Sequence, residues 1–428
     1  MTVASVICEY NPFHTGHKHQ YDYIKEEIKA DYIVCIMSGD FVQRGEPAVF
    51  DKYVRAEAAL MCGADLVLEL PVRYACADAG GFAGGAVRLL DALGAVDELW
   101  FGSESGDIRT FENIAAALSS ESDCFKRRLS EGLKEGMPYP KARALAVADS
   151  PAHESEFFEG DRKDILSFLE SPNNILGIEY CIALKKLSSA IRPLTVKRVG
   201  SGHNDEKISG AHASASAIRK LISDGHFADA MPLMPGNAFE LFSRYLKDSG
   251  PVFADDFSMM LKYKLMSCGI PELTSFSGVS EDLALRIRNE LNAFRSFSQF
   301  ADLIKARSMT RTHVNRALLR ILLDIRRGGR PDAGGCPVNS IASGCPAGSD
   351  TAGFAHILAM GNCGKLLSKI KEKGSISLCS TPSVIKDGSY DEDLFASNLY
   401  ESVRAFKSGT PFVHEFKRRL IVTAPEQP

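Results

Sequence analysis

The sequence lacks a long hydrophobic run and a Cys-x-x-Cys pair. Among its 428 residues, no apolar stretch approaches the roughly 20 residues that a helix needs to cross a bilayer. The first residues contain no basic segment of the kind that begins a secretion signal. The eleven cysteines are scattered, and several lie in apolar runs, where a free thiol behaves as a small hydrophobic group. We therefore expect a cytoplasmic protein with reduced cysteines and no membrane segment.

Two glycine-rich nucleotide motifs and an excess of charge of one sign are also absent. The chain has no Gly-x-x-x-x-Gly-Lys-Ser/Thr and no Gly-x-Gly-x-x-Gly, which disfavours a P-loop enzyme and a dinucleotide-binding fold. The formal net charge is −4, so there is no overall positive field to attract a nucleic acid. A local patch would have to bind one instead.

Two histidines, His14 and His17, lie where an expected strand turns into an expected helix. Residues 3–7 predict a short buried strand, and residues 17–30 carry apolar side chains at helical spacing. A helix N-terminus has free N–H groups that favour phosphate, and Gly16 permits close approach of the backbone. Two imidazoles there could stabilise the charge that develops during nucleotidyl transfer. The pattern is the His-x-Gly-His signature typical of the nucleotidyltransferase superfamily.

Two other interpretations of this motif remain open. The histidines could be solvated side chains of a capped turn, or His14, His17 and His19 could bind a metal ion. The metal site is disfavoured, because no cysteine or carboxylate cluster at ligand spacing accompanies the histidines.

Strand and helix patterns alternate along the first hundred residues. Expected strands cover residues 31–37, 66–70 and 98–102, and expected helices cover residues 51–62 and 80–93. This alternation predicts an α/β fold with a Rossmann-like parallel sheet wrapped by helices, in which ligands bind beyond the strand C-termini. We expect this nucleotidyltransferase-like domain to span residues 1–228, with a helical excursion over residues 107–170 and a further strand at 194–199.

Helical patterns dominate after residue 228. We expect a mainly helical domain over residues 229–428, interrupted by a flexible insertion near residues 328–353, which are rich in glycine, proline and serine. A basic patch falls in this half, with eight cations against the single acid Asp324. Such a patch is commonly the solvated face of a helix, but the imbalance favours contact with a polyanion. Its cations are Lys305, Arg307, Arg311, Arg316, Arg320, Arg326, Arg327 and Arg330.

Two further segments have the chemistry of a phosphate site. Ser214-x-Ser216-x-x-Arg219 opens a helix and resembles the Ser-Ser-Thr-x-x-Arg element of nucleotidyltransferases, although serine there is also an ordinary helix cap. The polar segment 38–48 follows a strand and contains Arg44, and Lys52 lies on the next helix. The alternative for that segment is a surface loop with solvated charges, but its place at the sheet edge favours a functional role.

Together these segments resemble the tRNA(Met) cytidine acetate ligase family. The resemblance covers nearly the whole chain except residues 328–353. It rests on Glu-Tyr-Asn-Pro-Phe-His-x-Gly-His at residues 9–17, Met-Ser-Gly-Asp-Phe-Val-Gln-Arg-Gly-Glu-Pro-Ala at residues 37–48, Asp-Leu-Val-Leu-Glu-Leu-Pro at residues 65–71, Asn-Asn-Ile-Leu-Gly-Ile-Glu-Tyr at residues 173–180, and shorter matches at 101–104, 139–143, 214–219, 310–312 and 317–319.

The resemblance implies an ATP-dependent ligase that works in two steps. Acetate and ATP would form acetyl-adenylate and pyrophosphate, with Mg²⁺ accompanying the ATP. The wobble cytidine of elongator tRNA(Met) would then accept the acetyl group on N4, giving N4-acetylcytidine. Only the resemblance points to acetate, since the residues themselves would allow any small carboxylate. The loop around His203 departs from the family pattern, which often has an aromatic residue nearby.

The resemblance, together with the chemistry of the residues described above, assigns roles to residues. ATP contacts are expected at Gly102, Asn173, Arg198, Val199, Ser216 and Arg219, and in the first loop, which comprises Ile7, Cys8, Glu9, Tyr10, Asn11, Pro12, Phe13, His14, Thr15, Gly16, His17, Lys18, His19 and Gln20. His14, His17, Arg44 and Lys52 are the expected catalytic residues, and Arg311, Arg316 and Arg320 would hold tRNA. Two alternatives stay open: a small-molecule nucleotidyltransferase that makes a dinucleotide-type cofactor, and an RNA-binding protein without catalysis.

Overall fold

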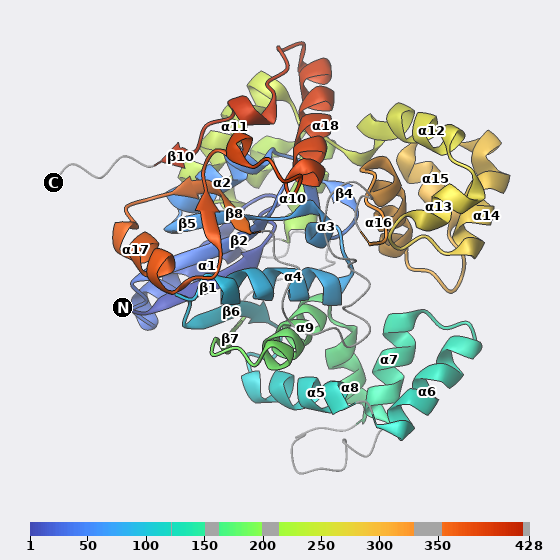
Figure 1. The fold of residues 1–428 in the computed structure, drawn as a ribbon, viewed down its shortest axis with the longest axis horizontal. Coiled ribbons are helices and arrows are strands. Elements are labelled where there is room, and N and C mark those ends of the chain that lie inside the picture. Colours follow the sequence, from blue (N-terminus) through green and yellow to red (C-terminus); the bar gives the residue numbers. More distant parts are fainter. Residues whose placement is uncertain (121, 150–161, 199–213, 329–352, 423–428) are drawn as a thin grey trace.

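The computed structural model describes residues 1–120, 122–149, 162–198, 214–328 and 353–422. A mainly parallel sheet with the strand order β10-β8-β5-β2-β1-β6-β7 forms the centre (Figure 1). Its parallel strands are β1 (Val3–Cys8), β2 (Tyr32–Ser38), β5 (Leu66–Leu70), β6 (Glu98–Ser103) and β7 (Arg192–Lys197). The expected Rossmann-like α/β fold is therefore confirmed.

Alternate residues of the strands pack against helices on opposite faces of the sheet. Val34 and Ile36 of β2 face one core, whereas Ile33 and Cys35 face the other. The first core is covered by α4 (Ala79–Ala92), α5 (Ile108–Ser120), α9 (Pro172–Leu187) and α17 (Gly364–Lys373). The second is covered by α1 (Thr15–Asp22), α2 (Lys52–Met61), α10 (Ala215–Ser223) and α11 (Gly236–Ser249). None of the described helices is both long enough and apolar enough to cross a membrane.

Two groups of helices extend from this body (Figure 1). The first is the expected excursion, which contains α6 (Asp123–Lys134), α7 (Tyr139–Ala148) and α8 (Arg162–Glu170). The second has its own hydrophobic core and consists of α12 (Ser258–Ser267), α13 (Ile270–Ser275), α14 (Glu281–Glu290), α15 (Phe297–Ile304) and α16 (Arg311–Leu322). Between β2 and α2, a small hairpin of β3 (Phe41–Val42) and β4 (Glu46–Pro47) reaches toward α16.

The last part of the chain returns to the sheet, which differs from the expectation of a mainly helical region after residue 228. β8 (Phe354–Met360) pairs antiparallel with β5, and β9 (Ser377–Cys379) and β10 (Ile421–Val422) pair with β8. A short apolar run such as residues 354–360 fits a buried strand and a buried helix equally well by periodicity. The remaining helices are α3 (Val72–Ala75) and α18 (Asp391–Ser408). The expected insertion at 328–353 lies almost wholly outside the described residues.

The first expected helix is also shorter than predicted. Residues 17–30 carry a helical pattern, but α1 ends at Asp22 and a π-helical turn, Tyr23–Glu27, follows it. The strand expected at 194–199 begins two residues earlier, as β7. Both differences concern the residues at which a helix or strand begins or ends, and the sequence pattern predicts these boundaries least well.

Candidate functional site at the sheet edge

The histidine motif lies immediately beyond the C-terminal end of β1. His14 caps α1, and its Nδ1 accepts a hydrogen bond from the Gly16 N–H at 3.1 Å. The Nδ1 of His17 accepts from the His14 N–H at 3.2 Å. Because Nδ1 is an acceptor in both rings, the proton of each neutral imidazole lies on Nε2. The pair therefore offers two Nε2–H donors at a helix N-terminus.

Ring packing orients the two histidines. Their rings stack with centroids 3.7 Å apart. The His17 ring also meets the edges of Tyr10 and Phe13, at centroid distances of 4.8 and 5.4 Å, and both of these aromatic side chains are buried. Gly16 is required locally, because a Cβ atom there would lie 2.9 Å from Cε1 of His14. The motif is thus a rigid turn rather than a pair of solvated side chains.

Positive charge surrounds the histidine pair. Burial, then the neighbouring His14 and then Arg198 lower the pKa of His17 well below its usual 6.5, so this ring is neutral at pH 7. Arg198 follows β7, and its side chain crosses β6 at Gly102, where a Cβ atom would lie 3.1 Å from Cγ of Arg198. Burial lowers the pKa of Arg198 itself. A buried guanidinium beside neutral donors suits an anionic ligand such as phosphate.

A second guanidinium reaches the same turn from α10. Arg219 donates to the Asn11 carbonyl at 2.8 Å and to Oγ of Ser216 at 3.0 Å. Burial and then the positive charge of Arg44 lower the pKa of Arg219. The structure therefore gathers His14, His17, Arg198, Arg219 and Arg44, although they come from distant parts of the chain.

Arg55, three residues after Lys52 on α2, is a further cation of this edge. It is fully buried, and its guanidinium donates to the carbonyls of Glu9 and Gly39, of Ser38 at 3.1 Å and of Phe50 at 3.0 Å. It thereby ties the loop after β1 to the loop after β2. All its partners are backbone atoms, so no local sequence pattern reveals the clamp.

The other expected ATP contacts are distributed around this edge. Asn173 begins α9 and donates to Glu104 at 2.8 Å, while Gln20 donates to the Trp100 carbonyl at 3.4 Å. Lys18 forms an ion pair with Asp22 on its own helix. Cys8 is buried and donates to a backbone carbonyl of β2. Val199 lies outside the described residues.

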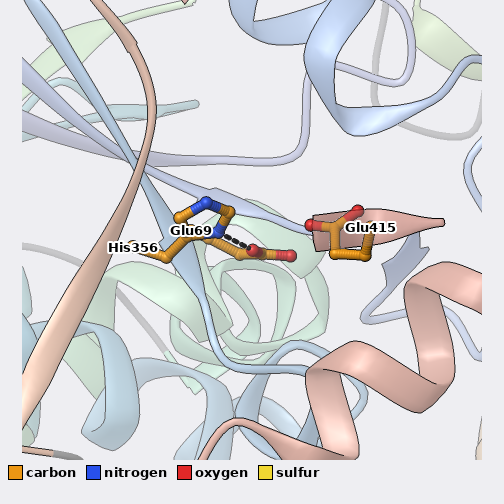
Figure 2. A group of neighbouring side chains, drawn as sticks. All are labelled: Glu69, His356 and Glu415. Atoms are coloured by element: carbon orange, nitrogen blue, oxygen red, sulfur yellow. Dashed lines mark hydrogen bonds and ion pairs between the residues drawn. The ribbon is translucent and has the colours of Figure 1, made fainter. Parts of the chain in front are cut away.

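Lys52 lies in a buried ion-pair network and has no exposed surface. Its Nζ is 2.8 Å from Glu69, 2.6 Å from Glu415 and 2.8 Å from Oγ of Ser397. Nδ1 of His356 lies 2.6 Å from Glu69. Glu69, His356 and Glu415 (Figure 2) are close enough to hold a metal ion, but the ammonium of Lys52 supplies the cation between the two carboxylates. This placement does not support direct contact between Lys52 and a nucleotide, and it makes Lys52 a positioning residue.

Asp40 is a buried carboxyl at this edge, and its titration should make the stability of the fold depend on pH. Its Oδ1 accepts from the Lys52 backbone N–H at 2.8 Å, and burial raises its pKa to about 7 although Lys52 opposes the rise. An unfolded chain ionises this carboxyl near pH 4, so folding takes up a proton between about pH 4 and pH 7 and stability falls as the pH rises.

We expect Asp40→Asn to raise the melting temperature, by about 5 °C at pH 8, because the amide keeps the acceptor without the buried charge. The gain should be small at pH 5, grow through pH 7 and then level off. Thermal unfolding from pH 5 to pH 9 would measure it, and a gain of the same size at every pH would contradict the assignment.

Arg316 and Arg320 of α16 are enclosed at the junction with the sheet rather than lying on an open surface, whereas Arg311 binds within the helical cluster. Arg316 donates to the Gln43 carbonyl of the β3–β4 hairpin at 3.3 Å, and Arg320 is only 8% exposed. Nε of Arg320 has no hydrogen-bond partner within the described part of the chain. Arg311 pairs with Asp302. The expected basic face is thus folded in at the junction between the helical cluster and the sheet.

Comparison with known proteins identifies the family. A family described as HIGH Nucleotidyl Transferase matches residues 1–410. The tRNA(Met) cytidine acetate ligase of Acetivibrio thermocellus is 39% identical over 384 residues, covering 88% of each chain, and that of Alkaliphilus metalliredigens is 34% identical, covering 94% of each. The apo crystal structure of Thermotoga maritima TmcAL superposes with a TM-score of 0.87 at 31% identity, covering 99% of this chain and 100% of that one.

A second crystal structure of the same Thermotoga protein, bound with alpha-thio ATP, superposes with a TM-score of 0.85 at 31% identity and with the same coverage. Sequence and structure agree over nearly the full length in all these comparisons. The chain is a member of the HIGH nucleotidyl transferase family and belongs with the tRNA(Met) cytidine acetate ligases.

Proposed function

We propose that this chain uses ATP and acetate to form N4-acetylcytidine at the wobble position of elongator tRNA(Met), through an acetyl-adenylate intermediate. The observation that carries the proposal is the pair of Nε2–H donors of His14 and His17, flanked by Arg198 and Arg219 at the sheet edge. The names of the relatives and the alpha-thio ATP complex of the Thermotoga protein support the same substrates, tRNA(Met) and ATP.

In the first step, an oxygen of acetate attacks the α-phosphorus of ATP. The new bond forms to this phosphorus as its bond to the bridging oxygen breaks, and pyrophosphate leaves with the electron pair. Negative charge grows on the phosphate oxygens, and donors that are already fixed in place stabilise it. His14 and His17 are such donors, and Arg198, Arg219 and Arg44 supply the balancing positive charge.

In the second step, N4 of the cytidine attacks the acetyl carbonyl, AMP leaves, and the nitrogen loses a proton. No nucleophilic side chain is needed, because the activated acetyl group is a mixed anhydride.

The side chains around the histidine pair are mainly imidazole and guanidinium donors, which suit phosphate, whereas Mg²⁺ prefers oxygen ligands. Mg²⁺ would therefore accompany the ATP phosphates rather than bind to these side chains.

The decisive experiment is transfer of labelled acetate to a transcript of elongator tRNA(Met), with ATP and Mg²⁺, followed by nucleoside analysis. We expect label in N4-acetylcytidine at the wobble position, dependent on ATP. ATP turnover with small metabolites but without label in RNA would favour a cofactor-forming nucleotidyltransferase. Binding of RNA with no ATP turnover would favour the non-catalytic alternative.

The junction arginines should contribute to RNA binding. We expect the double variant Arg316→Gln/Arg320→Gln to weaken binding of tRNA and to reduce the slope of log K against log salt by about 0.8, since one phosphate contact accounts for roughly 0.7–0.9 and Arg320 is only 8% exposed. Fluorescence anisotropy at several salt concentrations would measure the slope, with circular dichroism to verify folding. Arg286→Gln/Arg295→Gln is the matched control, because both lie in the helical cluster outside α16. An unchanged slope would remove these residues from the proposed RNA site.

A further inference from the structure

The segment that follows α18 is fixed to the body of the protein by alternate residues. The Val413 N–H donates to Glu401 at 3.0 Å, and the Glu415 N–H donates to Asn398 at 2.9 Å. The Glu415 side chain points inward, where it meets Lys52 and accepts from the Tyr53 hydroxyl at 2.9 Å. Residues 413 and 415 therefore hold the segment in one orientation.

Three aromatic residues, Phe412, His414 and Phe416, alternate with these anchors along the chain. Phe412 is 47% exposed and Phe416 is 36% exposed, and His414 lies between them at ring-centroid distances of 6.3 and 5.1 Å. Nδ1 of His414 accepts from the Phe416 N–H at 3.2 Å. These distances join the three rings into a continuous aromatic strip, although Phe416 lies in the short 3-10 turn Glu415–Lys417 and Nε2 of His414 also lies 3.2 Å from Nδ2 of Asn398 on α18. We call residues 412–419 the aromatic strip.

The exposed charge of the aromatic strip is positive. Lys417 and Arg419 are both exposed. Arg418 is held by Glu401 at 2.8 Å, and Glu415 and Glu401 are themselves buried and paired with cations. The acids of this region are therefore turned inward, and within the described part of the chain the outer face combines aromatic rings with exposed positive charge.

We propose that the aromatic strip binds unpaired nucleotides of the RNA substrate, with bases stacked on Phe412 and Phe416 and phosphates at Lys417 and Arg419. Aromatic rings beside cations are the usual platform for single-stranded nucleic acid, and sequence-specific RNA recognition mostly targets loops with unstacked bases. The strip is joined to the catalytic edge, because Glu415 pairs with Lys52 and the Lys52 backbone binds Asp40. The inference rests on the proposed function, since it names a second contact for the same RNA.

The test compares Phe412→Ala/Phe416→Ala with Phe406→Ala. Phe406 is the control because it is 90% exposed on α18 and lies outside the strip. We expect the double variant to bind tRNA about ten- to a hundredfold more weakly, whereas the control binds as the wild type does. Acetate-dependent exchange of ATP with pyrophosphate, measured without RNA, should be unchanged in both variants. In parallel, Lys417→Gln/Arg419→Gln should lower the salt slope of tRNA binding by about 1.5.

Several results would overturn the inference. Wild-type tRNA affinity in the double variant would do so, and so would a parallel loss of exchange without RNA, which would indicate a disturbed Lys52 network. A change in sedimentation with unaltered tRNA binding would assign the strip to self-association instead. Failure of the proposed function itself is distinguishable, because the wild-type protein would then form no N4-acetylcytidine.

Discussion

Replacing His17 with alanine should slow acetate-dependent exchange of ATP with pyrophosphate by a factor of about 100 to 1,000, as expected when one preorganised donor to a developing oxyanion is removed. The ring is held by His14 and by the edges of Tyr10 and Phe13, so its Nε2–H is fixed before the nucleotide arrives. ATP affinity should change far less than the rate, because the donor matters most when charge has moved onto the phosphate.

The control for this variant is His226→Ala, since His226 is exposed and lies beyond the proposed site. Thermal unfolding should show that both variants are folded. Because His17 is neutral, the exchange rate of the wild type should not fall through protonation of this ring between pH 8 and pH 6.5. If His17→Ala kept wild-type exchange, the assigned role of the motif would be wrong.

The largest loss of stability is expected from Lys52→Met. Burial opposes the charge of Lys52, but Glu415 and Glu69 outweigh it and raise the pKa of the ammonium well above its usual value. Although burial favours the neutral form of Glu69, Lys52 and His356 lower its pKa to about 2. Removing the ammonium therefore leaves two buried carboxylates without their main cation. The free energy of unfolding should fall by about 3–5 kcal/mol.

A double-mutant cycle separates charge from packing in this network. Lys52→Met/Glu415→Gln removes the ammonium together with one carboxylate, and we expect it to recover a substantial part of the lost stability. Urea unfolding at pH 7 of the wild type, both single variants and the double variant would give the coupling energy. A loss below about 1 kcal/mol for Lys52→Met would show that the network is not the stabilising element we infer.

The pattern of apolar and polar residues predicted those parts of the fold that depend only on residues close together in the sequence. Residues 66–70 were predicted to form a buried strand, and they form β5 with the same first and last residues. The turn that carries His14 and His17 was predicted from the strand before it, the helix after it and Gly16. Such features depend on neighbours in sequence, so one sequence is enough to find them.

The rest depends on contacts between distant segments. Lys52 was predicted to be a catalytic cation beside a polar loop, but it pairs with carboxylates that come from β5 and from residue 415. Arg316 and Arg320 were predicted to contact RNA from an exposed basic patch, but the β3–β4 hairpin packs against α16 beside them, where Gly45 brings the two backbones together. No periodicity in the sequence encodes these pairings.

The position of β8 also has a consequence for synthesis of the protein. β8 lies against β5, yet it is separated from β5 by most of the chain, including the whole helical cluster. Until residues 354–360 leave the ribosome, β5 presents an unpaired edge, which is the kind of edge that recruits strands from other chains. Glu69 on that strand also lacks His356 during this interval. A nascent chain therefore passes through a long stage in which its nucleotide-binding sheet is incomplete and vulnerable to aggregation, until β8 has been made and covers β5.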